Sequence, residues 1–451
     1  MKVKKTLARW GVLLFCLMLI GNAPQTFAWY DLPEVDIQAK AALLIDPQTD
    51  TVLFEKNMHE RVYPASLTKI MTTLLALEHG SLTDGIAASE TALTGLDPQG
   101  STQNIKPGEI MTLEDLLYCI MVASANEACN VVAEHIAGSV DAFVEMMNEE
   151  ARRLGCEDTH FTNAHGLHDE NHYTTAWDVY LITKEALRNP RFMEIANTPN
   201  KKIAPTNMTE KERVFYTTNH LISKLKVSDY IYYQAKGIKT GNTLAAGHCL
   251  VSTAEKNGYY YVSVILGAAR EESGVIRSFT ETKALFEWGF ENFENRQLVS
   301  TSDIVEKVSV LQGLNEDEVV LVPEQKLTRL LPKNLKTEDI KREVVLDSPG
   351  GVMAPIKRGD TLGEMTLVYR GEALGSVPLV AAINIDRSQL EASREEIVNF
   401  FEQAWVRYTI FGIIALVALY TLATILYNVR RKRNRRKNVM HTDRYKGRRG
   451  R

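Results

Sequence analysis

A helix predicted near the N-terminus constrains the fold more than any other segment of this 451-residue chain. Pro64 opens the helix, and Gly80 ends it directly after His79. Its apolar side chains, which spread over much of its surface, are Ile70, Met71, Leu74, Leu75 and Leu77. A helix that is apolar on most sides is buried among other elements. The chain therefore needs further layers of structure around residues 64–79.

One lysine interrupts this apolar helix. Lys69 follows Ser66 by three residues, so the two side chains share a face and the amine can reach the hydroxyl. A serine hydroxyl is a poor nucleophile until a neighbouring base takes its proton. Lysine is such a base only if burial or a nearby cation, such as Lys239, lowers its pKa well below ~10.4. We predict Ser66 as nucleophile and neutral Lys69 as base; the alternative is a chance meeting on a solvated helix.

Strand signals stand at both ends of the region that contains this helix. Residues 41–45 and 51–55 flank a turn-rich connection and predict a hairpin. Residues 248–254 and 259–267 predict a second hairpin around Asn257-Gly258, because Asn-Gly between two strands is the strongest short hairpin signal. The two hairpins lie about 200 residues apart, a separation that a single sheet can span.

Helical patterns fill the interval between the hairpins. Besides residues 64–79, residues 112–137, 141–154 and 177–187 predict helices. Strands at both ends with helices between them predict an α/β (α+β) domain whose sheet gathers distant strands. We place this catalytic domain at residues 29–293.

A second motif, Ser124-Ala125-Asn126, falls within an apolar stretch. The Ser124 hydroxyl is placed to pass a proton between the Lys69 amine and a leaving nitrogen. The Asn126 amide both donates and accepts hydrogen bonds, which suits it to hold a peptide backbone. Taken alone, such polar residues are more often helix-breaking caps.

A third motif, Lys239-Thr240-Gly241, precedes a predicted strand pair. Its ammonium and hydroxyl groups suit a substrate carboxylate, and Gly241 lets a substrate backbone approach closely. A strand edge beside Ser66 would pair with an extended peptide. The backbone N–H groups of Asn242 and Ser66 would then form an oxyanion hole. By itself the tripeptide also fits an ordinary turn.

The N-terminus carries an export signal. Basic residues precede the apolar run Trp10–Gly21, and Thr26-Phe27-Ala28 places small residues at the −3 and −1 positions of a cleavage site. We predict a signal peptide at residues 1–28, with an uncleaved anchor as the alternative.

The C-terminus carries a predicted transmembrane helix. Residues 408–429 are uncharged and have about the ~20 residues that a helix needs to cross a bilayer. Residues 430–451 hold twelve Lys and Arg residues against one acidic residue. The positive-inside rule then puts this tail in the cytoplasm and the body outside the membrane. A buried soluble helix is the alternative for the span, and nucleic-acid binding does not explain a basic run in this position.

Between the catalytic domain and the span, two further segments are predicted. Residues 294–386 hold short β-like runs broken by Asn, Gly and Pro, which predicts a small all-β domain. Residues 387–407 predict an amphipathic juxtamembrane helix. Its apolar side chains on one side are Leu390, Ile397, Phe401 and Trp405.

The cysteines predict neither a disulfide framework nor a metal site. Beyond residue 28 they are Cys119, Cys129, Cys156 and Cys249. A disulfide framework is a device of small domains, so buried free thiols are expected in a body of this size. No C-x-x-C pair or histidine cluster indicates a metal, and we predict no cofactor.

The three motifs in this order resemble the S-x-x-K, S-D-N and K-T-G set of the penicillin-binding proteins. The chain is similar to low-molecular-mass penicillin-binding proteins, the D-alanyl-D-alanine carboxypeptidases of peptidase family S11. Further similar stretches are Tyr63–Lys69, Gly100-Ser101, Lys106–Gly108, Phe161–Leu167, Gly237–Gly241, Ala245–Gly247 and Trp288–Phe290. The resemblance is strong over about residues 35–293 and looser over 294–386.

The resemblance implies a serine acyl-enzyme made from a peptidoglycan stem peptide, release of terminal D-alanine, and acylation by β-lactams. Ser66 carries over as nucleophile, Lys69 as base and Ser124 as proton relay. Lys239 and Thr240 carry over as binders of the terminal carboxylate. Arg277, in the stretch Ile276–Phe279, resembles an arginine that also holds this carboxylate.

Two departures from the family pattern stand out. Ala125 replaces the Asp of S-D-N, which leaves the chemistry intact because the family's carboxypeptidases tolerate variety at this position. The C-terminal end is a full hydrophobic span with a basic tail, whereas many relatives attach by an amphipathic helix alone. This second difference concerns anchoring.

Three other functions are weighed against the carboxypeptidase. A class A β-lactamase needs a further glutamate, and no E-x-x-L-N-like segment lies between Ser124 and Lys239. A membrane-bound β-lactam sensor carries its sensor domain after several spans, whereas here one span follows the domain. A scaffold without turnover would not need all three motifs.

Overall fold

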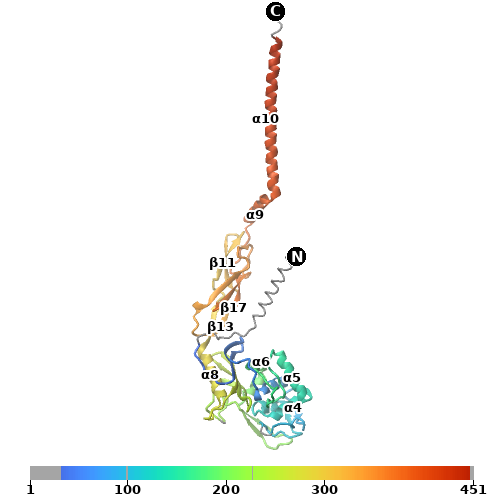
Figure 1. Ribbon diagram of the computed structural model, residues 1–451, viewed down its shortest axis with the longest axis vertical. Coiled ribbons are helices and arrows are strands. Elements are labelled where there is room, and N and C mark those ends of the chain that lie inside the picture. Colours follow the sequence, from blue (N-terminus) through green and yellow to red (C-terminus); the bar gives the residue numbers. More distant parts are fainter. Residues whose placement is uncertain (1–31, 98–99, 226, 447–451) are drawn as a thin grey trace. The chain divides into compact units, whose positions relative to one another are not determined.

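The computed structural model describes residues 32–97, 100–225 and 227–446, so the predicted signal peptide at 1–28 lies outside the described residues (Figure 1). The chain forms two compact units. The first contains the described residues up to Asn295 together with Leu330–Leu335, and the second contains Arg296–Arg329 and the chain from Lys336 onward. The domain boundary predicted at residues 293/294 stays a prediction.

A five-stranded sheet of order β2-β1-β9-β8-β7 forms the centre of the first unit. Its strands are β1 (Ala41–Asp46), β2 (Thr51–Lys56), β7 (Ala235–Thr243), β8 (Gly247–Lys256) and β9 (Tyr259–Ala268). Neighbouring strands pair antiparallel, and β1 lies between β2 and β9. The prediction that one sheet gathers both hairpins is therefore confirmed. Strand β7 stands at the edge of the sheet.

The turn between β8 and β9 is the one that its sequence predicts. Asn257 and Gly258 have φ angles of 54° and 83°. Two consecutive positive φ angles match the twist of a two-residue hairpin, and Asn and Gly adopt them at little cost.

Helices pack around the predicted central helix. They are η1 (Ala65–Thr68), α2 (Lys69–His79), α3 (Leu113–Met121), α4 (Asn126–Ala137), α5 (Val140–Arg153), α6 (Ala176–Ala186) and α7 (Pro190–Ala196). α2 contacts α3, α4, α5, α6 and α7, and its residues from Lys69 to Ala76 are buried. The structure confirms a central helix, although its first turn is a 3₁₀ helix.

The prediction of one continuous helix at residues 112–137 is wrong, because the structure has two helices there, α3 and α4. The chain leaves helical geometry after Met121 and re-enters it at Asn126. Ser124 has a φ of 62°, which a continuous right-handed helix excludes. The turn is closed by the Ala125 backbone N–H, which donates to the Cys119 carbonyl at 3.0 Å. Apolar side chains on both sides of the turn hide this break in the sequence pattern.

Two small hairpins and a C-terminal helix complete the first unit. Strand β3 (Gly85–Ala87) pairs with β4 (Ile110–Thr112), and β5 (Asn200–Ile203) pairs with β6 (Arg213–Tyr216). Helix α8 (Arg277–Asn292) contacts β8 and β9.

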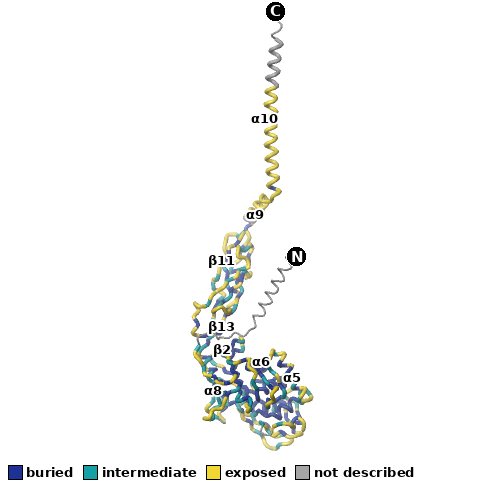
Figure 2. Tube along the Cα trace, in the orientation of Figure 1, coloured by how far each residue is buried: buried dark blue, intermediate teal, exposed yellow. Residues whose placement is uncertain are grey.

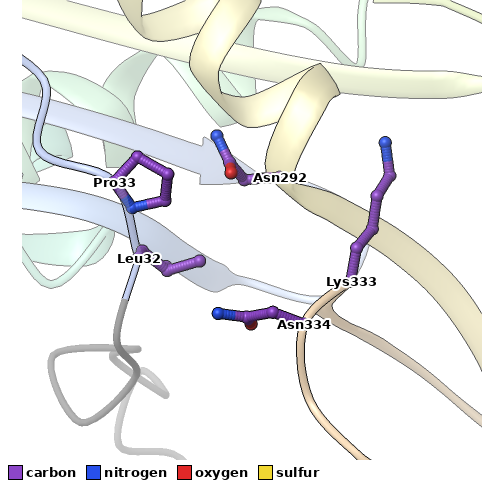
Figure 3. Close-up of a pocket in the computed structure, with 5 residues that line it drawn as sticks. All are labelled: Leu32, Pro33, Asn292, Lys333 and Asn334. Carbon is purple, nitrogen blue, oxygen red and sulfur yellow. The ribbon is translucent and has the colours of Figure 1, made fainter.

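A hollow of about 500 Å³ lies at the end of α8. Figure 3 shows Asn292 at the helix end, with Leu32 and Pro33 on one neighbouring segment and Lys333 and Asn334 on another. The Lys333 amine donates to the carbonyls of Phe290 (3.2 Å) and Glu291 (2.8 Å). A cation at the last carbonyls stabilises a helix C-terminus. The segment with Lys333, which lines this hollow, therefore stabilises the C-terminal end of α8.

The second unit contains a six-stranded sheet of order β14-β16-β17-β12-β11-β15. The strands are β11 (Glu306–Leu311), β12 (Glu318–Pro323), β14 (Lys341–Leu346), β15 (Val352–Met353), β16 (Thr361–Tyr369) and β17 (Glu372–Ala381). The predicted small β domain is confirmed. The sequence did not predict β15, nor the ribbon of β10 (Phe293–Val299) and β13 (Leu327–Pro332).

Two helices follow the β domain along the chain, α9 (Gln389–Glu402) and α10 (Ala404–Lys446) (Figure 1). Within α10, the stretch Ala404–Arg433 is long and apolar enough to cross a membrane, and it contains an 18-residue window with a mean hydropathy of 2.3. Apart from buried Val406, the residues of both helices whose burial is described are exposed (Figure 2). The predicted amphipathic helix and the predicted span therefore both exist as helices.

The four cysteines of the described residues are free and buried, as predicted.

Candidate active site

A cleft of about 1160 Å³ in the first unit brings the three sequence motifs together. Its walls include Ser66 from η1, Ser124 and Asn126 from the start of α4, and Thr240, Gly241 and Asn242 from β7. Lys69 and Lys239 are almost fully buried beside these residues. The third motif lies within edge strand β7 itself, whereas the sequence placed it before a strand pair. Distant segments meet here because β7 contacts η1, and α4 contacts α2, the helix that follows η1.

The amine of Lys69 has three oxygen atoms within hydrogen-bond distance. Its Nζ lies 2.8 Å from Asn126 Oδ1, 2.6 Å from the His165 carbonyl oxygen and 3.0 Å from Ser66 Oγ. The first two are carbonyl oxygens, which only accept hydrogen bonds. A neutral amine has two N–H groups and one lone pair. The two carbonyls take both hydrogens, and the lone pair is left for the Ser66 hydroxyl.

Burial makes the neutral amine accessible. It lowers the pKa of Lys69 to about 8, against the opposing influence of Cys129 and Glu127. The sequence left burial and the charge of Lys239 as alternative causes, and the principal cause is desolvation, because the side chain is 0% exposed. Near neutral pH a useful fraction of Lys69 can therefore accept a proton.

Lys239 lies under the opposite side of the cleft. Its Nζ donates to Ser124 Oγ at 3.0 Å and to the Thr240 carbonyl at 2.9 Å. Burial, followed by the charge of Lys69, lowers the pKa of Lys239 well below its usual value. Two buried ammonium groups in one site repel each other, which favours loss of a proton from the pair.

Ser124 is held in a conformation that few residues other than glycine adopt. Its φ of 62° directs the chain out of α3 and into α4. The hydrogen bond that the structure gives its hydroxyl is with Lys239, whereas the sequence prediction paired Ser124 with Lys69. Left-handed geometry at a non-glycine residue is a form of strain often found at functional sites.

Two glycines, Gly166 and Gly241, pack closely against η1, the turn that contains Ser66. A Cβ at Gly166 would lie 1.8 Å from the Ala65 carbonyl oxygen, and a Cβ at Gly241 would lie 3.1 Å from the Ser66 backbone nitrogen. Ala65 itself has a φ of 48°. Only residues without a side chain allow β7 and the 166 loop to approach η1 this closely. The close approach places the Ser66 N–H beside the strand that carries Asn242.

The segment from Thr162 to His172 supports this turn, a role that the sequence did not predict. Thr162 N–H donates to His172 Nδ1 at 3.1 Å, so the neutral ring carries its proton on Nε2. His172 Nε2 then donates to Thr68 Oγ1 at 2.8 Å, and Thr68 donates to the Ala65 carbonyl at 2.9 Å. Burial lowers the pKa of His172 to about 4, which keeps the ring neutral at ordinary pH.

Glu127 is a second residue that the sequence did not single out. It follows Asn126 at the start of α4 and is buried. Its Oε1 accepts from Thr102 Oγ1 at 2.7 Å and from the Gln103 backbone N–H at 2.5 Å. The Asn126 N–H donates to the Ser101 carbonyl at 2.9 Å. The start of α4 therefore holds the cleft wall around Ser101 in place.

Thr218 extends the site beside the third motif. Its hydroxyl lies 2.5 Å from that of Thr240, and both residues line the cleft. No motif marks Thr218, because the residue meets Thr240 only when the chain after β6 runs beside β7.

Arg277 does not lie where the resemblance placed it. Its neighbours Ile276 and Ser278 line the cleft, but its guanidinium binds Glu281 (2.9 Å), Glu271 (2.9 Å) and Asp36 (3.3 Å). Glu281 is buried and also accepts the backbone N–H groups of Gln38 and Ala39 at 3.0 and 3.1 Å. Arg277 thus fastens the N-terminal segment to α8. These three carboxylates occupy the guanidinium that was expected to hold a substrate carboxylate.

Two family models match the chain. The model for D-alanyl-D-alanine carboxypeptidase, peptidase S11, matches residues 28–270. The model for the penicillin-binding protein 5 C-terminal domain matches residues 293–387. The first covers more than half of the chain and contains all three motifs.

Curated relatives match most of the chain. D-alanyl-D-alanine carboxypeptidase DacF of Bacillus subtilis is 34% identical over 82% of this chain and 92% of its own length. DacC of Escherichia coli, also named a D-alanyl-D-alanine carboxypeptidase, is 28% identical over 85% of this chain and 91% of its own length.

Solved structures resemble both units. Penicillin-binding protein 5 of Haemophilus influenzae is 28% identical with a TM-score of 0.59, and the match covers 79% of this chain and all of that one. The carboxypeptidase DacD of Francisella tularensis is 25% identical with a TM-score of 0.61, covering 80% of this chain and 96% of that one.

The state of Lys69 predicts the pH dependence of acylation. If the neutral amine is the base, as the sequence predicts, the rate at which benzylpenicillin acylates Ser66 should rise with pH through a limb centred near pH 8. Stopped-flow measurement of acylation between pH 6 and 9.5 checks this. A rate that is constant across that range, with the fold intact, would rule out Lys69 as the titrating base.

The contacts of Glu127 predict that Glu127→Gln and Glu127→Ala change acylation in different ways. Glu127→Gln keeps an acceptor for Thr102 and Gln103 but removes a negative charge that raises the pKa of Lys69, so the acylation limb should move to lower pH. Glu127→Ala releases the cleft wall and should slow acylation by about tenfold or more.

Thr102→Val is the matched control for these two variants. It removes one hydrogen bond to Glu127 and keeps the charge, so the limb should stay in place. If Glu127→Gln and Thr102→Val shift the limb equally, the carboxylate does not act through its charge on Lys69.

The position of Arg277 predicts a loss of stability. Arg277→Ala leaves buried Glu281 without its cation and should lower the free energy of unfolding by about 2 kcal/mol. Thermal unfolding checks this, with Arg270→Ala on the same exposed segment as the control. A variant with unchanged Tm that turns over acid substrates poorly and amidated substrates normally would return Arg277 to the substrate site.

Proposed function

The chain belongs to the D-alanyl-D-alanine carboxypeptidases of peptidase family S11, and we propose that Ser66 carries its acyl-enzyme, with Lys69 as base. The observation that supports this most is the placement of Lys69 Nζ between two carbonyl acceptors and Ser66 Oγ. When the amine is neutral and donates to both carbonyls, its lone pair can accept the Ser66 hydroxyl proton. The substrate is the stem pentapeptide of peptidoglycan, and the products are D-alanine and the shortened peptide.

Acylation begins when Ser66 Oγ attacks the carbonyl carbon of the penultimate D-alanine. Lys69 takes the hydroxyl proton as the new C–O bond forms, so the amine becomes an ammonium group next to the oxyanion intermediate. The backbone N–H groups of Ser66 and Asn242 are the proposed donors to that oxyanion. Gly241 supports this assignment, because its lack of a side chain lets β7 approach the Ser66 nitrogen.

The intermediate collapses when the C–N bond breaks and the leaving nitrogen takes a proton. Ser124 is the proposed donor to that nitrogen. The proton that Lys69 took from Ser66 then passes to Ser124, which returns Lys69 to the neutral amine, and Lys239 holds the Ser124 hydroxyl in place by a hydrogen bond. Water then attacks the acyl-enzyme, Lys69 again takes a proton, and Ser66 leaves with its hydroxyl restored. One bond is hydrolysed and one water is consumed.

The substrate lies along the outer edge of β7, as we propose from the position of that strand at the edge of its sheet. An extended peptide beside an edge strand gains main-chain hydrogen bonds. The Asn126 amide nitrogen faces the opposite wall near Gly100, since its oxygen is bound to Lys69. The amide is therefore placed to donate to the peptide backbone.

The terminal carboxylate is assigned to Lys239 and Thr240, and Arg277 is removed from that role. Burial and the charge of Lys69 lower the pKa of Lys239, so its ammonium form needs a counter-charge. An arriving carboxylate supplies the counter-charge and raises that pKa again, so binding is coupled to protonation. The Thr240 hydroxyl, in contact with Thr218, supplies a neutral hydrogen bond.

β-Lactams acylate the same serine, in keeping with the family. The proposed location is the extracytoplasmic face of the cell membrane, with α10 as a single span and the basic tail in the cytoplasm. The apolar stretch Ala404–Arg433 supports the anchor, and the charge of residues 430–451 supports the orientation.

Mass spectrometry of the protein with benzylpenicillin tests the nucleophile. One adduct per chain is expected, on Ser66, and Ser66→Ala should give no adduct and release no D-alanine from a pentapeptide. Ser101→Ala is the control, because Ser101 also lines the cleft and should keep both activities. An adduct that maps to another serine contradicts the assignment.

A further inference from the structure

Helix α9 has apolar side chains with no protein to bury them among the described residues. Leu390, Ile397 and Phe401, at positions i, i+7 and i+11, share one face, and all are exposed. Glu396 and Glu402 lie away from that face. A helix of this kind beside a membrane span lies in the plane of the interface, with its apolar face toward the lipid.

The β domain of the second unit also exposes apolar side chains at one end. Leu311, Leu314 and Met353 are 46%, 48% and 49% exposed. Leu311 at the end of β11 is paired with Met353 of β15, and Leu314 follows in the next turn. We name these three residues the apolar tip.

Hydrogen bonds join the apolar tip to the chain that leads into α9. The Leu314 N–H donates to the Asp386 carbonyl at 2.7 Å, and the Ser388 N–H donates to the Gln312 carbonyl at 2.8 Å. The Arg387 Nε donates to Gln312 Oε1 at 2.7 Å. Because α9 begins at Gln389, the tip is fixed to the residues directly before that helix.

The length of α9 limits how far the tip can lie from the bilayer. The helix has 14 residues and is therefore about 21 Å long at 1.5 Å per residue. Ala404 begins the apolar span two residues after the helix ends. When α9 lies flat at the interface, its N-terminal end and the tip bonded to it come to the depth of the headgroups.

We propose that the apolar tip, Leu311, Leu314 and Met353, inserts into the outer leaflet of the membrane that α10 spans. This rests on the membrane anchoring proposed above. Charged residues near the tip are mixed, with Glu316, Asp317 and Asp386 against Lys357, Arg358 and Arg387. The contact is accordingly apolar, and its strength does not depend on the fraction of anionic lipid.

The free cysteines make a clean labelling experiment practicable. Burial raises the pKa values of Cys119, Cys129, Cys156 and Cys249, and all four are buried, so an added exposed cysteine reacts first. Leu314→Cys in the full chain, with Cys16 of the predicted signal peptide replaced by Ser, carries an environment-sensitive dye on the tip. Val345→Cys on β14 is the control, because it is exposed and lies at the opposite edge of the sheet from β15.

Both labelled proteins are reconstituted in vesicles of phosphatidylcholine with varied phosphatidylglycerol. Flotation with the vesicles reports anchoring by α10 separately from insertion of the tip. Dye on residue 314 should show a blue-shifted emission and about threefold stronger quenching by brominated lipid than dye on residue 345. The difference should persist at every phosphatidylglycerol fraction.

Three outcomes overturn the proposal. Protein that floats but whose residue 314 dye is quenched by aqueous iodide as strongly as the residue 345 dye has a tip in water. A signal that persists in detergent and grows with protein concentration assigns the tip to a second copy of the chain. Protein that fails to float contradicts the anchoring itself, and with it this proposal.

Discussion

The burial of Lys69 is the constraint on which the rest of the site depends. A lysine at the centre of an apolar helix is costly unless its nitrogen has partners, and Asn126 and the His165 carbonyl provide them. The same contacts leave one lone pair directed at Ser66. Stability and reactivity therefore come from one arrangement, since the groups that satisfy the buried nitrogen also hold it within hydrogen-bond distance of Ser66 Oγ, and burial makes the neutral amine available.

The backbone around Ser66 explains why several glycines and strained residues gather there. Strand β7 and the 166 loop both press against η1, which is possible only where Gly241 and Gly166 have no side chain. The left-handed conformation of Ala65 lies at this contact, and that of Ser124 lies in the turn closed by the Ala125 N–H and the Cys119 carbonyl. This rigidity keeps the reacting groups within hydrogen-bond distance before a substrate arrives.

Much of the site was predictable from local patterns, and Arg277 shows where such prediction ends. The three motifs name Ser66, Lys69 and Lys239, and all three meet at the cleft. Arg277 stands in a similar local stretch, but Asp36, 241 positions away in the chain, shares its guanidinium with Glu271 and Glu281. A local sequence pattern cannot predict that a carboxylate far away in the chain, such as Asp36, will bind the Arg277 guanidinium in the folded protein.

The sequence by itself determined the central helix, the two hairpins and the apolar span, because each follows from the spacing of neighbouring residues. It also determined the identity of the reacting groups. Only the tertiary structure decided the state of Lys69, the partner of Ser124 and the roles of Glu127 and His172. Lys69 meets His165 across 96 positions and Lys239 meets Ser124 across 115, and the burial that sets their pKa values exists only once those segments have packed together.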